Sequence, residues 1–350
     1  MNIHEKYMLR CIQLGKKGLG TTAPNPMVGA VIVHKNKIIG EGYTSPYGGA
    51  HAEVNAIHSV KNKKLIPEAI LYVTLEPCSH FGKTPPCTDL ILEHKISEVV
   101  IGLQDPHDKV AGKGIKKLQE SGCKVTVGVL EKSCRHHHRR FLSFQEKKRP
   151  YIVLKWAETS DGFIAPDKKR RGNTPQPFWI SNTQSKQLAH KWRSEEQAIL
   201  IGTTTALDDN PKLTLRSWDG KNPTRIVLDK NLKVSTDSNV LDATVKTIVI
   251  TEIGDETKYV DGVCYELMDF SLPIAKQICA ILYKHSITSV LIEGGTRTLQ
   301  TFIDEGLWDE AKIFQAATTF LNGIRAPKIS GQLSDKKNIT SDTLSIYIND

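Results

Sequence analysis

The spacing of apolar and polar residues predicts an α/β domain in the first half of the chain. Apolar residues recur at helical spacing over residues 4–17, and later short runs are alternating or wholly apolar, as strands are. The expected strands are residues 28–33, 38–43, 71–75, 98–103 and 124–130, and further helices are expected from His51, Cys87 and Gly112. Helices between most of these strands predict a five-stranded α/β sandwich that begins with a hairpin.

The second half repeats this alternation and predicts a separate α/β unit. Its strands are expected at residues 151–155, 198–201, 225–228, 247–251, 289–292 and 311–316. Residues 131–149 are basic and include His136-His137-His138, which we expect in a solvated closing helix and linker. We therefore expect two domains, residues 1–148 and residues 149–350.

Composition is that of an ordinary globular protein. The 350 residues are 39% hydrophobic and 24% charged, and no apolar run is long enough to suggest a membrane span. The first residues lack the basic and then apolar pattern of a secretory signal, and seven unevenly spaced cysteines do not form a disulfide framework. These features favour the reducing cytoplasm.

Positive charge is concentrated in the first half. Residues 1–150 carry 23 Lys and Arg against 13 Asp and Glu, whereas residues 151–350 carry 24 against 25. Such an excess attracts phosphate, either on a small metabolite or along a nucleic-acid backbone, and composition does not separate the two. Basic faces kept for solubility explain it equally well.

One short stretch of the basic half carries a set of metal ligands. His51, Cys78 and Cys87 supply one imidazole and two thiols, which fill three tetrahedral zinc positions and leave the fourth for an acidified water. Glu53 completes the pattern His-x-Glu followed by Pro-Cys, in which the carboxylate moves protons and does not bind metal. The pattern predicts a hydrolytic zinc site with Glu53 as its catalytic residue.

Two plainer interpretations stay open. A structural zinc site would take a fourth protein ligand, for which His80 is near enough in sequence, but it would leave Glu53 without a role. A buried histidine and two unrelated core thiols would need no metal.

The second half offers weaker chemistry. Gly294-Gly295 follows an apolar strand and precedes a helix start, which lets backbone N–H groups approach a phosphate. A plain turn explains it as well, and no G-x-G-x-x-G follows the first strand of this half.

Taken together, the motifs resemble those of the bifunctional riboflavin-biosynthesis deaminase/reductase family (RibD) over nearly the whole chain. The segments that carry the resemblance are residues 22–29, 51–53, 76–87, 160–162, 179–181, 208–211 and 293–295. Cytidine and transfer-RNA deaminases differ here, because their two cysteines lie in Pro-Cys-x-x-Cys, whereas eight residues separate Cys78 from Cys87.

For the first domain, the resemblance implies a cytidine-deaminase-like three-layer sandwich with zinc on His51, Cys78 and Cys87. It also implies substrate contacts from Asn25, His80, Lys83 and Asp105. The family usually continues Asp-Pro-Asn-Pro, whereas this chain has Asp105-Pro106-His107-Asp108, so His107 replaces the asparagine.

For the second domain, the resemblance implies a dihydrofolate-reductase-like α/β fold that binds NADPH. Implied cofactor residues are Lys155, Ala157, Trp179, Thr205, Asp209, Gly295, Thr296, Arg297, Thr298, Leu299, Gln300 and Thr301. Implied substrate residues are Arg193, Leu213, Arg216 and Glu293, with the arginines gripping a phosphate. Pro177 stands where a polar residue is usual, so one side-chain contact is lost.

The implied function is zinc-dependent deamination of a phosphoribosyl diaminopyrimidine, followed by NADPH-dependent reduction of the ribosyl group to ribityl. The implied partners are this small molecule and a second copy of the chain, as a dimer or tetramer, with no nucleic acid and no membrane. Two alternatives stay open: a nucleic-acid or nucleoside deaminase with a non-reductase binding domain, and a zinc-stabilised binding protein without activity.

Overall fold

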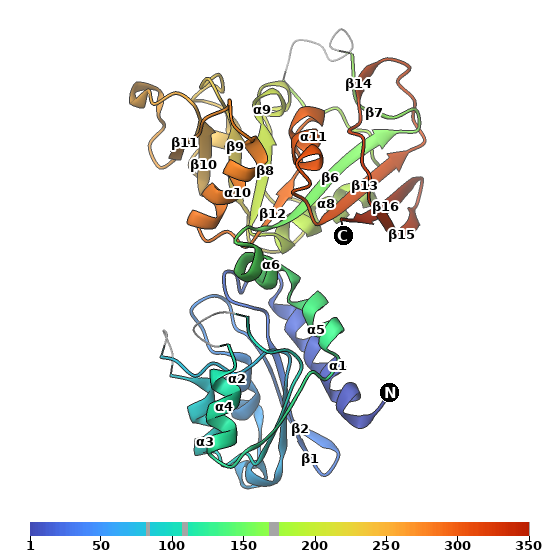
Figure 1. Cartoon of the computed structure of the whole chain (residues 1–350). Coiled ribbons are helices and arrows are strands. Elements are labelled where there is room, and N and C mark those ends of the chain that lie inside the picture. Colours follow the sequence, from blue (N-terminus) through green and yellow to red (C-terminus); the bar gives the residue numbers. More distant parts are fainter. Residues whose placement is uncertain (82–84, 107–110, 168–174, 350) are drawn as a thin grey trace. The chain divides into compact units, whose positions relative to one another are not determined.

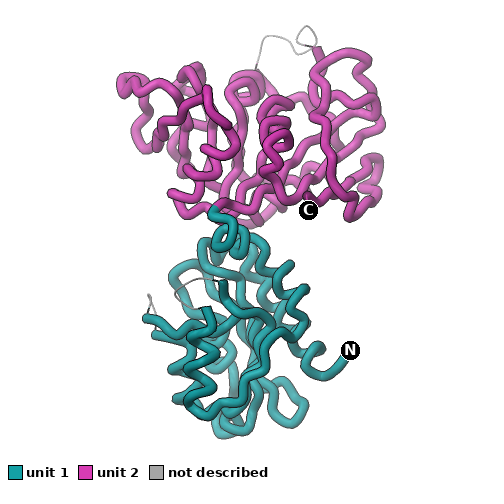
Figure 2. The backbone as a smooth tube through the Cα atoms, viewed as in Figure 1, with its two compact units in different colours: residues 1–148 teal, residues 149–350 magenta. Residues whose placement is uncertain are grey.

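Two units, Met1–Lys148 and Arg149–Asp350, make up the chain, and each has its own hydrophobic core (Figure 2). The computed structural model describes residues 1–81, 85–106, 111–167 and 175–349. Lys83 and His107 lie outside the described residues. No helix in the described ranges has the length and apolar character to cross a membrane.

The first unit is built on a five-stranded sheet in the order β2-β1-β3-β4-β5. The strands are β1 (Gly29–His34), β2 (Lys37–Tyr43), β3 (Ile70–Val73), β4 (Glu98–Ile101) and β5 (Lys124–Val127). β1 pairs antiparallel with β2 and β3, whereas β3, β4 and β5 are parallel to one another. All five strands lie where the apolar pattern predicts them.

Helices cover both faces of this sheet, so the unit has three layers. They are α1 (Ile3–Gly15), α2 (Ala52–Ser59), α3 (Cys87–Glu93), α4 (Lys113–Glu120), α5 (Glu131–His137) and α6 (Arg139–Lys147). Figure 1 shows α1 and α5 on one side of the sheet and α2, α3 and α4 on the other. Gly29 and Gly42 let the helices approach closely, since a Cβ would lie 1.9 Å from the Cys11 carbonyl oxygen and 2.3 Å from the Ala56 nitrogen, respectively.

The prediction of a solvated histidine run is wrong for two of its three members. His137 and His138 are only 2% and 1% exposed, because the chain between α5 and α6 packs on the sheet. His137 Nε2 donates to the Met27 carbonyl oxygen at 2.7 Å, and His138 Nε2 lies 3.0 Å from Thr74 Oγ1. Charge alone suggested a surface helix, whereas the imidazoles serve as polar members of the core.

The second unit contains a nine-stranded sheet in the order β11-β10-β9-β8-β12-β6-β13-β16-β15. Its strands are β6 (Tyr151–Thr159), β8 (Ala198–Gly202), β9 (Thr224–Leu228), β10 (Thr247–Thr251), β11 (Cys264–Leu267), β12 (Ser289–Ile292), β13 (Glu310–Ala316), β15 (Gln332–Ile339) and β16 (Asp342–Ile348). The strands from β11 to β13 are parallel, and β13, β16 and β15 pair antiparallel. β7 (Phe163–Pro166) and β14 (Gly323–Arg325) form a separate pair.

Alternate residues of the central strands face different helices. The helices are α8 (Thr183–Glu195), α9 (Thr203–Asp209), α10 (Ile274–Lys284) and α11 (Thr296–Asp304). Ile152 and Leu154 of β6 pack in the same cluster as Phe302 of α11, whereas Val153 packs with Trp192 of α8. Because side chains alternate along a strand, Lys155 faces α8 like Val153. This face carries the candidate site of the second unit.

Candidate functional sites

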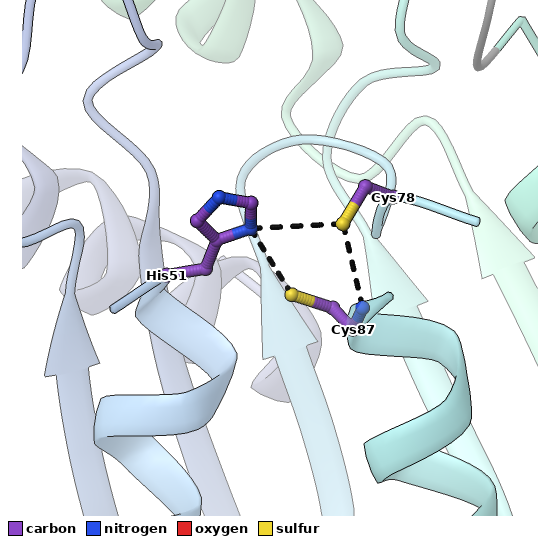
Figure 3. Close-up of side chains that lie close together, drawn as sticks. All are labelled: His51, Cys78 and Cys87. Atoms are coloured by element: carbon purple, nitrogen blue, oxygen red, sulfur yellow. Dashed lines mark hydrogen bonds between the residues drawn. The ribbon is translucent and has the colours of Figure 1, made fainter. Parts of the chain in front are cut away.

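His51, Cys78 and Cys87 meet at one end of the first sheet (Figure 3). His51 Nδ1 lies 3.2 Å from Cys87 Sγ and 3.6 Å from Cys78 Sγ, and the three donor atoms all lie within 4.8 Å of one another. The carboxylate of Glu53 is not a member of this group of donors. Within the described residues, the geometry thus brings together the three predicted ligands and leaves Glu53 outside the donor group, next to Cys87.

Local structure explains how these side chains converge. His51 is the N-cap of α2 and Cys87 is the first residue of α3, so both stand at helix N-termini. Cys78 lies in the loop that follows β3, where its Sγ accepts a hydrogen bond from the Cys87 backbone N–H at 3.3 Å and its carbonyl oxygen accepts one from the Thr88 N–H at 3.1 Å. Helix N-termini and backbone donors favour the thiolate form that a metal needs.

The electrostatics fit a divalent soft metal. Hydrogen bonds from Cys87 and His51 hold the pKa of Cys78 well below its usual range, whereas the Cys78 thiolate and burial raise that of Cys87. One imidazole and two thiols are a common zinc donor set, and a bound cation would displace the remaining thiol proton. The donor chemistry and spacing therefore fit zinc.

Glu53 is a buried acid on the first turn of α2. Its side chain is 4% exposed. Burial and the neighbouring Cys78 raise the pKa of Glu53 to about 7, against lowering contributions from His51 and from a hydrogen bond with Cys87. A carboxyl group with such a pKa both accepts and releases a proton near neutral pH.

The predicted substrate residues of this unit differ in how far they are exposed to solvent. Asn25 is half-buried in a turn where its backbone N–H donates to the Thr22 carbonyl oxygen at 2.9 Å, and His80 is exposed on the loop after Cys78. Asp105 is 7% exposed and follows β4. Which of them contact a substrate stays a prediction.

Sequence reasoning missed the part played by Glu76. This buried side chain accepts four backbone hydrogen bonds, from Asp105, Gly112, Gly114 and Ile115, at 2.9–3.2 Å. Its place directly before Pro77-Cys78 was the only available signal.

In the second unit, Glu293 joins two predicted site residues from different elements. Arg193 of α8 donates to it through Nε at 3.0 Å and Nη2 at 2.7 Å, and Lys155 Nζ of β6 lies 3.8 Å from Glu293 Oε2. Burial alone would raise the pKa of Glu293, but Arg193 and Lys155 outweigh it and hold the pKa at about 2. Two N–H groups of Arg193 thus already donate to a carboxylate. The prediction that Arg193 binds the substrate phosphate did not include this partner.

The segment after α9 comes close to the same helix. The Arg216 backbone N–H donates to His190 Nδ1 at 3.3 Å, and His190 lies one turn before Arg193 on α8. The Arg216 side chain is exposed. Leu213 has a positive φ of 56° and a side chain buried in the core with Ile199 and Ala206, so only its backbone is available to a ligand.

The predicted cofactor segment lies against the start of α9. The Gly295 N–H donates to Thr205 Oγ1 at 3.0 Å, and a Cβ on Gly202 would lie 2.5 Å from Thr298 Oγ1. Leu299 points into the core, and Trp179 is 54% exposed with Lys186 Nζ 4.3 Å from its ring centroid. Ala157 lies two residues before the end of β6, and Asp209 is the last residue of α9. Glycine, threonine and helix starts thus meet at the carboxyl ends of β8 and β12, where open α/β sheets bind ligands.

Family models match both units. Residues 1–103 match the cytidine and deoxycytidylate deaminase zinc-binding region, which contains the His51, Cys78 and Cys87 group, and residues 150–344 match the RibD C-terminal domain. A zinc-binding deaminase unit followed by this α/β unit defines a bifunctional deaminase/reductase. The chain belongs to the RibD family and is a riboflavin-biosynthesis deaminase and reductase, so the predicted family and fold class are confirmed.

Relatives match along most of the chain. The riboflavin biosynthesis protein RibD of Aquifex aeolicus (strain VF5) is 40% identical over 336 residues, covering 94% of this chain and 88% of the relative. RibD of Bacillus amyloliquefaciens is 38% identical, covering 94% and 89%. A Thermotoga maritima crystal structure, of a diaminohydroxyphosphoribosylaminopyrimidine deaminase/5-amino-6-(5-phosphoribosylamino)uracil reductase, has a TM-score of 0.89 at 38% identity and covers 99% of both chains.

Proposed function

We propose that residues 1–148 deaminate a diaminopyrimidine that carries a ribosyl phosphate, and that residues 149–350 then reduce its ribosyl group with NADPH. The observation that supports this most strongly is the convergence of three soft donors, within 4.8 Å of one another, beside a buried Glu53 outside the donor group. The Thermotoga maritima structure, similar over 99% of both chains, is named for these two reactions.

In the first unit, His51 Nδ1 and the thiolates of Cys78 and Cys87 would hold zinc. Bound zinc supplies a water molecule of lowered pKa next to the substrate. Glu53 would take one proton from the attacking water and deliver it to the pyrimidine ring nitrogen. It would then carry a second proton, from the hydroxyl group now on the ring carbon, to the amino group, which leaves as ammonia. Asn25, His80, Lys83 and Asp105 would orient the base and its phosphate.

In the second unit, NADPH would supply the hydride. Thr205, Asp209 and residues 295–301 would hold the cofactor at the carboxyl ends of β8 and β12, with Lys155, Ala157 and Trp179 beside it. Glu293, fixed by Arg193, would orient the sugar, while Leu213 and Arg216 would meet the substrate through the segment after α9. No protein nucleophile is required, and the side chains contribute binding and orientation.

The cytoplasmic location, the choice of NADPH over NADH and a dimeric or tetrameric state stay predictions. The Cys78 to Cys87 spacing continues to argue against a nucleic-acid base as the substrate.

One incubation tests both activities. Purified protein is mixed with the phosphoribosyl diaminopyrimidine and NADPH, while ammonia release and nicotinamide absorbance are followed. We expect both signals, and we expect chelation to abolish ammonia release but to spare reduction of substrate that is already deaminated. Absence of ammonia release from zinc-loaded protein would refute the deaminase proposal.

A further inference from the structure

The buried carboxylate of Glu76 accepts hydrogen bonds from backbone N–H groups. It is 4% exposed, and the hydrogen bonds found for it in the described part of the chain come from four backbone N–H groups. Oε2 accepts from Asp105 at 3.2 Å and Gly112 at 3.0 Å, and Oε1 accepts from Gly114 at 2.9 Å and Ile115 at 3.1 Å. Each oxygen thus takes two N–H groups.

Only an anion satisfies this arrangement fully. Gly112, Gly114 and Ile115 belong to the N-cap and first turn of α4, where unpaired N–H groups and the helix dipole favour negative charge. A glutamine would place its NH₂ group against one of the two N–H pairs, leaving those donors without an acceptor.

The same carboxylate stands next to the zinc ligands along the chain. Glu76 precedes Cys78 by two residues, and its own N–H donates to the Leu103 carbonyl oxygen at 2.9 Å. Gly114 packs so tightly that a Cβ there would lie 2.2 Å from the Pro77 carbonyl oxygen. The turn that carries Cys78 and the backbone that carries Asp105 are therefore joined through one side chain.

We propose that Glu76 is a positioning residue that sets the distance between Asp105 and the metal ligand Cys78, and thereby the fit of the pyrimidine in the deaminase site. This inference rests on the proposed deaminase function. Because the carboxylate bonds to the Asp105 N–H directly, its loss would displace Asp105 first. A shift of about 1 Å in a positioning group is enough for an effect of about a hundredfold on rate.

The test is a double-mutant cycle of Glu76→Gln with Asp105→Asn, read as deaminase kcat/KM. We expect Glu76→Gln alone to lower kcat/KM by about tenfold or more, with one zinc per chain retained and with NADPH-dependent reduction unchanged. In the Asp105→Asn background, the same change should lower kcat/KM by less than about twofold, since the residue through which it acts is already altered.

Controls keep the outcomes separate. Glu93→Gln, on an exposed position of α3, should leave every readout unchanged. Glu76→Asp keeps the charge on a shorter side chain and replaces Glu76→Gln in the cycle if the latter does not fold. Wild-type kcat/KM in Glu76→Gln, loss of its zinc, or effects of the two substitutions that multiply in full would each overturn the proposal. Failure of the wild-type protein to release ammonia would instead overturn the proposed function.

Discussion

Arg193 and Glu293 form a two-point ion pair, with Nε 3.0 Å from Oε1 and Nη2 2.7 Å from Oε2. Their side chains are only 12% and 10% exposed, and Lys155 Nζ lies 3.8 Å from the same carboxylate. The Glu293 carboxylate is thus the counter-charge for both Arg193 and Lys155. The pair connects α8 to the residue that follows β12. It thereby holds two elements of the proposed reductase site together.

Replacing Glu293 by glutamine should destabilise the second unit. Arg193 and Lys155 would then be buried without a counter-charge, and breaking a buried pair in this way costs about 3–5 kcal/mol. All five tryptophans lie in the second unit, so the denaturant dependence of their fluorescence reports on it selectively. Asp335→Asn, which removes an exposed pair with Lys337 in the same unit, is the matched control and should leave this fluorescence transition in place. Equal midpoints for Glu293→Gln and wild type would contradict the prediction.

Replacing Glu53 by glutamine should silence deamination without releasing zinc. An amide of the same shape cannot carry a proton, and general acid–base help of this kind is worth about 10²–10⁴-fold in rate. Metal content and NADPH-dependent reduction should stay at wild-type levels, because Glu53 lies outside the donor group and in the other unit from the proposed cofactor site. Turnover at the wild-type rate, measured as ammonia release, would rule out its assigned role.

Gly114→Ala should damage the deaminase and spare the reductase. The added Cβ would lie 2.2 Å from the Pro77 carbonyl oxygen, so the backbone next to Cys78 would have to move. We expect a loss of at least about tenfold in ammonia release. Gly254→Ala is the control, since its Cβ makes an ordinary 3.7 Å contact with Leu267. A Gly114→Ala protein with full deaminase activity would show that this close approach is not needed.

The buried histidines should make the first unit sensitive to acid. Burial lowers the pKa of His137 to about 4, against a raising contribution from its bond to Met27, whereas an unfolded histidine has a pKa of about 6.5. The unfolded chain therefore binds more protons between these values. Stability is full above about pH 6.5 and falls as the pH drops toward about 4, by on the order of 3 kcal/mol.

The measurement is urea unfolding at several pH values, followed by hydrogen exchange of peptides from residues 1–148. His137→Gln should flatten part of the pH dependence, and the remainder belongs to His138, whose pKa burial also lowers. The exposed His58→Gln should keep the wild-type profile. A wild-type midpoint that does not change between pH 7 and about pH 4.5 would contradict the pKa assignment.

Sequence patterns were sufficient where burial and periodicity agree. The strands β1, β3, β8 and β12 are almost wholly buried apolar runs. Two of the three proposed zinc ligands, His51 and Cys87, stand at helix starts that the sequence also marks. The sequence did not predict β15, because this edge strand has almost no buried residue to give an apolar pattern. In its neighbour β16, the apolar residues Leu344, Ile346 and Ile348 do alternate with other residues.

Tertiary contacts account for the rest. Nothing in the sequence pairs Arg193 with Glu293, since a hundred residues separate them and only the parallel sheet brings them together. The role of Glu76 depends on where the first turn of α4 packs, and the burial of His137 depends on how α5 meets the sheet. Such partners are set by topology and not by local pattern.

X-ray absorption at the zinc edge tests the central claim most directly. For the wild-type protein the account predicts two sulfur ligands at about 2.3 Å and nitrogen or oxygen ligands at about 2.0–2.1 Å, with the same spectrum for Glu53→Gln and one sulfur fewer for Cys87→Ser. A metal shell without sulfur, or one that loses a ligand in Glu53→Gln, would contradict it.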